Sequence, residues 1–170
     1  MSKVISITVK KSGKLDSKSI QKNGVPNGLH ENFYSNGIKS SEGNYKDGLK
    51  DGEWKYFYES GKLSSVVTYY QGNKEGLRKK YYPSIEPELM IVENFKTNKR
   101  HGSYKKYYDE LDGSYLMIDT NYNEGKLHGF LKRFDENGVL RELEFYEDGN
   151  KSGVWEFYDE DSKLIKTKVY

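Results

Sequence analysis

Few side chains in this sequence could carry out catalysis. There are three histidines and no cysteine, so cysteine nucleophiles, zinc–thiolate sites and disulfides are excluded. His101 and His128 each precede a recurring glycine, where other repeats have Asp51, Glu75 or Ser152, which predicts solvated turn residues. No serine lies in a nucleophile-elbow context, and neither an HExxH motif nor a phosphate-binding loop occurs. We therefore expect no enzymatic activity, no metal site and no cofactor.

One acidic group remains, formed by Asp109, Glu110 and Asp112. Three carboxylates in one loop could hold a cation, but a solvated loop tip has the same composition. The third histidine, His30, stands in the column of Trp54 and therefore predicts a packing role.

The composition indicates an all-β protein. The chain has 16 tyrosines and 17 glycines but no alanine, and it is 15% aromatic. Tyrosine and β-branched residues favour strands, whereas glycine and asparagine favour turns. The 28 basic and 26 acidic residues are interspersed and give a net charge of +2, which argues against a nucleic-acid partner. No apolar stretch is long enough for a signal peptide or a membrane span, so we expect a cytoplasmic protein.

A glycine-and-aromatic unit recurs along the chain. Its glycine register is Gly28, Gly52, Gly76, Gly102, Gly129 and Gly153. Five residues after each glycine stands an aromatic residue, in order Phe33, Phe57, Tyr81, Tyr107, Phe134 and Tyr158. Periods of this length are typical of repeat architectures.

Each unit reads as a β-hairpin. Two strand-length runs of aromatic and β-branched residues flank Asn36-Gly37 in one unit and Asn137-Gly138 in another. Asn-Gly between such runs predicts a tight turn in which both central residues have φ > 0. The Gly-x-x-x-Gly segment, such as Gly125–Gly129, predicts the turn between units. We therefore expect an elongated, twisted, single-layer antiparallel β-meander of about seven hairpins.

The whole chain, 1–170, is expected to form one repeat domain. Residues 1–27 are a degenerate copy, as expected for the capping end of a repeat array. The predicted repeat units are 28–51, 52–75, 76–101, 102–128, 129–152 and 153–170.

Two units carry insertions at the turn between their strands. One lies around Pro83–Glu88 and includes Glu86, and the other lies around Asp109–Gly113. Inserted loops on a repeat scaffold often carry function, but tolerated drift would look the same. Glu86, Asp109 and Asp112 are therefore candidate partner-binding residues.

A second candidate site follows from strand alternation, because alternate residues share a face. Six residues after the repeat glycine stands a tyrosine column, and beside it lie three cations. The column is Tyr34, Tyr58, Tyr82 and Tyr108, and the cations are Arg78, Lys80 and Lys106. Tyrosine and arginine are enriched at interfaces, which favours a protein-binding face. Cross-strand aromatic packing that only stabilises the sheet is the alternative.

The repeat pattern resembles the MORN-repeat variant of bacteria. The matching residues are Gly52, Trp54, Phe57, Tyr58, Gly61, Leu63, Tyr69, Gly72 and Gly76, and the resemblance extends over roughly residues 24–170. It implies an antitoxin or immunity protein that neutralises a cognate toxin by binding it. A scaffold or lipid-headgroup-binding module is the alternative that classical MORN repeats imply. The expected oligomeric state is a monomer or an edge-paired dimer, because an open sheet exposes its edges.

Overall fold

The computed structural model describes residues 4–9, 15–84, 86, 88–109 and 115–170, and every regular element in them is a β-strand. The strands are β1 (Val4–Val9), β2 (Leu15–Lys22), β3 (Val25–Phe33), β4 (Lys39–Lys46), β5 (Leu49–Phe57), β6 (Leu63–Tyr70), β7 (Asn73–Tyr81), β8 (Leu89–Lys96), β9 (Lys99–Tyr107), β10 (Leu116–Asn123), β11 (Lys126–Phe134), β12 (Leu140–Glu147), β13 (Asn150–Tyr158) and β14 (Leu164–Val169).

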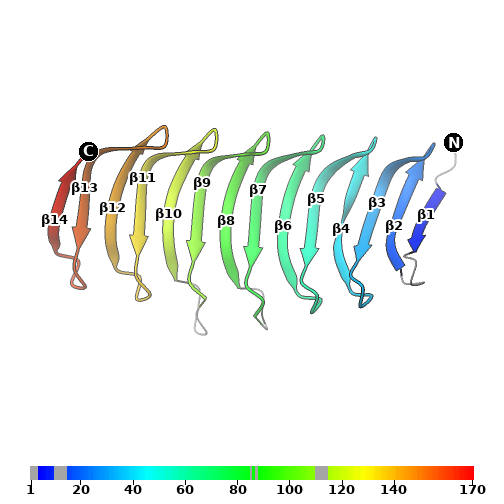
Figure 1. Ribbon diagram of the computed structural model, residues 1–170, viewed down its shortest axis with the longest axis horizontal. Helices are drawn as coiled ribbons and strands as arrows, with labels where there is room; N and C mark the ends of the chain where they lie inside the picture. The colour runs from blue at the N-terminus through cyan, green and yellow to red at the C-terminus, as the bar shows by residue number, and fades with distance from the viewer. Residues whose placement is uncertain (1–3, 10–14, 85, 87, 110–114) are drawn as a thin grey trace. The chain divides into compact units, whose positions relative to one another are not determined.

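The chain divides into two compact units. The first comprises Met1–Gly76 with Pro83–Pro87, and the second comprises Leu77–Tyr82 with Glu88–Tyr170, so that β7 contributes to both. Within each unit, consecutive strands are antiparallel neighbours in a single layer (Figure 1). The predicted all-β meander of hairpin repeats is therefore confirmed.

The turn chemistry differs from the prediction. Of the pair Asn36-Gly37, only the glycine has positive φ (86°), and its N–H donates to the carbonyl of Tyr34. This turn is a longer loop with one left-handed residue. Both residues are left-handed instead in the turns between units, as at Asp47 (φ 51°) and Gly48 (φ 81°). The two-residue turn that favours hairpin twist therefore joins successive units, not the two strands of one unit.

The repeat glycine also has a different place from the one predicted. Gly52 lies inside β5 with φ 74°, at a point where the pairing with β4 shifts: Asn44 faces Asp51, but Gly43 faces Trp54. Only glycine adopts such an angle without strain. The glycine register therefore marks a recurring β-bulge, which increases local twist.

In each of the two compact units, this bulge places one tryptophan at the centre of a sheet face. We call this side of each sheet the tryptophan face. Trp54 is fully buried in the first unit, and Trp155 is 6% exposed in the second. Each indole N–H donates to a backbone carbonyl, that of Asn44 at 3.0 Å and that of Phe145 at 3.1 Å. A single-layer sheet thus builds its core from side chains packed along one of its own faces.

Candidate functional site

The tryptophan face of the first unit is closed by its own side chains. Trp54 packs over Gly43 so tightly that a Cβ there would lie 2.3 Å from the indole ring. Lys50 lies 4.0 Å from the indole centroid and donates to the Tyr56 hydroxyl at 2.8 Å. Tyr69 packs edge-on against the indole. These contacts leave the indole no accessible surface.

A cation two residues before the repeat glycine covers the central aromatic in the second unit as well. Arg100 lies 5.2 Å from the ring centroid of Tyr104, and Lys151 lies 4.5 Å from that of Trp155. In the repeat around Gly129, which lies between these two repeats in the sequence, leucines take both positions, Leu127 and Leu131. Three of the repeats therefore combine a cation and an aromatic ring at these positions, the arrangement of a cation–π pair.

A buried carboxylate lies between two arginines in the second unit. Glu93 is fully buried, with Oε1 2.7 Å from Arg78 Nη2 and Oε2 2.6 Å from Arg100 Nε. Although burial opposes the charge of Arg100, the hydrogen bond to Glu93 raises the pKa of this guanidinium above its ordinary value. Arg78 also lies over Phe95. The buried charge is therefore paired, as the cost of desolvation demands.

A second buried carboxylate, Glu144, is satisfied in the same way. Arg133 Nε donates to it at 2.9 Å, and the Tyr146 hydroxyl donates at 2.8 Å. Burial works against the charge of Glu144, but these hydrogen bonds lower its pKa. Burial and the bond to Glu144 raise the pKa of Tyr146 to about 12, so that the phenol stays a donor.

The candidate cations Arg78, Lys80 and Lys106 share the tryptophan face of the second unit. Lys106 faces Ile91 on one side and Ile118 on the other. Lys80 follows Arg78 by two residues on β7, and Ile91 precedes Glu93 by two on β8, so the Arg78–Glu93 contact places Lys80 beside Ile91. Among the described residues, neither Lys80 nor Lys106 has an ion-pair or hydrogen-bond partner.

The tyrosine column holds successive repeats together. The Tyr34 hydroxyl donates to the carbonyl of Phe57 at 2.6 Å, that of Tyr82 to Tyr107 at 2.8 Å, and that of Tyr108 to Phe134 at 2.9 Å. All four column members, including Tyr58, are half-buried. The column therefore has a structural role, and contact of these residues with a partner stays a prediction.

Aspartates take over where the tyrosine column ends, and their bonds differ. The carboxylate of Asp135 accepts from the backbone N–H groups of Asn137 and Val139 in its own turn. Asp159 accepts in the same way from Asp161 and Lys163. A link between repeats is thus replaced by a link within one turn.

Two of the three acidic candidates in the inserted turns, Glu86 and Asp109, lie among the described residues. Glu86 is exposed and belongs to the first unit, and its carbonyl accepts from the Ser84 hydroxyl at 2.7 Å. Asp109 is exposed in the second unit. Burial of Tyr82 raises the pKa of its hydroxyl, and the negative charge of the nearby Asp109 raises it further. Asp112 lies outside the described residues.

Of the expectations for the histidines, the packing role of His30 is confirmed, but the turn positions expected for His101 and His128 are wrong, because these residues lie inside β9 and β11. His30 packs edge-on against Tyr45 at 5.2 Å, which confirms its packing role. His101 and His128 each approach a turn carboxylate at 3.6 Å, those of Glu124 and Asp148.

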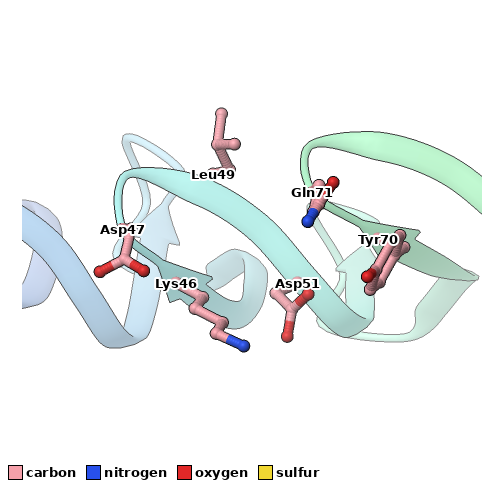
Figure 2. A pocket seen from close by; sticks show the side chains of 6 residues that line it. All are labelled: Lys46, Asp47, Leu49, Asp51, Tyr70 and Gln71. Atoms are coloured by element: carbon pink, nitrogen blue, oxygen red, sulfur yellow. The ribbon is translucent and has the colours of Figure 1, made fainter.

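The first unit has a hollow of about 160 Å³. Figure 2 shows the side chains that line it, beside two turns between repeats. The hollow is lined by Lys46, Asp47, Leu49, Asp51, Tyr70 and Gln71. Leu49 points away from the two carboxylates, so the polar and apolar groups do not converge. Its volume is below the roughly 300–1,000 Å³ of small-molecule sites, and we assign no ligand to it.

Within the described ranges, no three acidic or histidine side chains gather as metal ligands would. None of the described segments forms a helix that could cross a lipid bilayer.

The family model described as "MORN repeat variant" matches residues 26–47, 50–70 and 127–148. These stretches lie in the regular units, and the two units with insertions are not matched. A search of curated proteins finds no significant match to this chain. The chain is therefore similar to MORN repeat proteins over three repeats, which indicates a repeat protein involved in binding.

Sequence reasoning missed the buried carboxylates Glu93 and Glu144 and the covering cations Lys50, Arg100 and Lys151. Each glutamate stands two residues before an aromatic of the repeat, Phe95 or Tyr146, where Val67 stands in a regular unit. Writing out the alternation of the second strand of each hairpin, as for the first, would have shown these acids on the tryptophan face.

Proposed function

We propose that this chain is a non-enzymatic binding protein, an antitoxin or immunity protein that neutralises a cognate toxin by covering it. The observation that carries the proposal is the uncovered sheet. All regular elements among the described residues are strands in a single layer, so the faces of each unit stay accessible to another protein.

Two further features support binding over catalysis. The hollows at the surface of the first unit are small, about 160 and 150 Å³. The buried carboxylates are each paired within the sheet, Glu93 with Arg78 and Arg100 and Glu144 with Arg133, so their charges have a structural explanation. The similarity to MORN repeats points in the same direction.

Coexpression with the product of the neighbouring gene tests the proposal. We expect that product to stop growth when expressed alone, to be harmless beside this chain, and to co-purify with it. A neighbouring product that neither harms cells nor binds the chain would contradict the proposal.

A further inference from the structure

The second unit carries a row of side chains on its tryptophan face in which Arg133 is paired with Glu142 and Glu144, but Lys80 and Lys106 have no partner among the described residues. We call Lys80, Ile91, Lys106, Ile118 and Arg133 the cationic row. Cross-strand pairing joins Ile91 to Lys106, Lys106 to Ile118, and Ile118 to Arg133. Cations and isoleucines therefore alternate from strand to strand.

The charge around this row is unbalanced. Arg78 and Arg100 share the single carboxylate of Glu93, which leaves excess positive charge one row away from Lys80 and Lys106. In the same unit Lys99, Lys105 and Lys163 each have a carboxylate within 4 Å, whereas Lys79 and Lys132, on the opposite face, have none among the described residues. Lys80 and Lys106, two half-buried lysines without a described counter-charge, attract an external anion.

We propose that the cationic row is the docking surface for an acidic segment of the partner protein, an inference that rests on the proposed function. The isoleucines between the cations favour a protein segment, because its apolar side chains can fill the gaps between its carboxylates. An anionic membrane rewards denser clusters of about four to eight cations. Nucleic acid likewise requires a broad basic face.

The geometry also gives the spacing of the carboxylates. Lys80 on β7 and Lys106 on β9 are separated by one strand, β8. Strands lie about 4.8 Å apart, so the two positions are about 9.6 Å apart. An extended polyproline-type chain rises about 3.1 Å per residue and brings every third side chain to one side. The row therefore matches a segment with an acidic residue at every third position.

Fluorescence polarisation with a labelled twelve-residue peptide, four repeats of Glu-Leu-Ser, tests this inference on the full chain. We expect salt-sensitive binding that K80E/K106E weakens at least about tenfold. A peptide of four Lys-Leu-Ser repeats should bind K80E/K106E better than it binds the wild type. The matched control is K79E/K132E, which makes the same charge change on the opposite face of the same unit, on β7 and β11, and should bind the glutamate peptide normally.

Thermal unfolding of each variant checks that the fold is intact, and K80Q/K106Q serves as a milder pair if charge reversal disturbs it. The inference is overturned if the glutamate peptide does not bind, if both reversed pairs weaken binding equally, or if a DNA oligonucleotide or a phosphatidylserine vesicle binds more tightly than the peptide. A neighbouring gene product that binds wild type and K80E/K106E equally would overturn the docking surface while leaving the proposed function standing. A product that does not bind the wild type would overturn the function instead.

Discussion

The cationic row of the second unit has a counterpart at the same repeat positions in the first unit, and the two rows differ in charge. In the first unit the row consists of Ser17, Asn32, Ser41, Tyr56 and Ser65. These side chains are uncharged, and neighbours bond to one another, as when the Asn32 amide donates to the Ser41 hydroxyl at 2.9 Å. In the second unit the row carries Lys106 between two isoleucines, with no described partner for its charge.

The difference shows how one backbone pattern can serve stability in one place and recognition in another. The central positions beside the row are packed in both units, around Trp54 in the first and around Glu93 and Trp155 in the second. Once that packing is secured, the adjacent row can vary. Polar groups that already bond to one another form no new hydrogen bonds with a partner. Ammonium groups without a counter-charge form new ion pairs when a partner's carboxylates bind to them.

The largest expected effect comes from breaking the buried ion cluster of the second unit. Glu93→Gln leaves Arg78 and Arg100 without their shared carboxylate, so we expect a loss of about 3–5 kcal/mol in unfolding free energy. Urea unfolding measures it. Glu124→Gln, in an exposed ion pair of the same unit, should change stability by no more than about 0.5 kcal/mol. Equal losses in the two variants would show that the Glu93 cluster is not a stabilising centre.

A smaller effect is expected from overpacking the first unit. Gly43→Ala places a Cβ 2.3 Å from the Trp54 ring, so the indole must shift, at a cost of about 1–3 kcal/mol. Thermal unfolding and the tryptophan emission maximum report this shift. Asn44→Ala, the next residue on the exposed opposite face, is the control and should leave both readouts unchanged. An unchanged emission maximum in Gly43→Ala would contradict the close packing.

The smallest effect concerns the links between repeats. Tyr108→Phe removes the hydroxyl that donates to the Phe134 carbonyl and should cost about 0.5–1.5 kcal/mol in unfolding free energy. Tyr115→Phe, at a ring 44% exposed, controls for the loss of a hydroxyl. If Tyr108→Phe unfolds like the wild type but binds a partner less tightly, the tyrosine column serves recognition instead of repeat packing.

The repeat pattern predicted the strands well because strand, turn and glycine recur with one period. The sequence could not separate the two kinds of turn, because Asn36-Gly37 and Asp47-Gly48 look equally suited to a hairpin. Asn36-Gly37 lies in the longer loop and has positive φ only at the glycine, whereas Asp47-Gly48 forms a two-residue turn with positive φ at both residues. Nor could the sequence show that Gly52 lies within a strand, since a bulge and a turn both require positive φ.

The positions of the candidate residues on the sheet were predicted in part, and their contact with a partner stays a prediction. Strand alternation placed Arg78, Lys80 and Lys106 on one face correctly, because that argument needs only the strand period. The same reasoning grouped the tyrosines with them, but it could not show that the Tyr34 and Tyr108 hydroxyls reach the next repeat. It also left Glu93 unnoticed, because the pairing of an acid with arginines on neighbouring strands depends on the register.

The most direct test of the docking surface is zero-length crosslinking. Carbodiimide coupling joins a bound carboxylate to a lysine amine that touches it, and mass spectrometry then identifies the lysine. With the Glu-Leu-Ser peptide on the full chain, we predict crosslinks concentrated at Lys80 and Lys106 and lost at high salt. Crosslinks concentrated on first-unit lysines such as Lys50, or spread evenly over exposed lysines, would contradict the account.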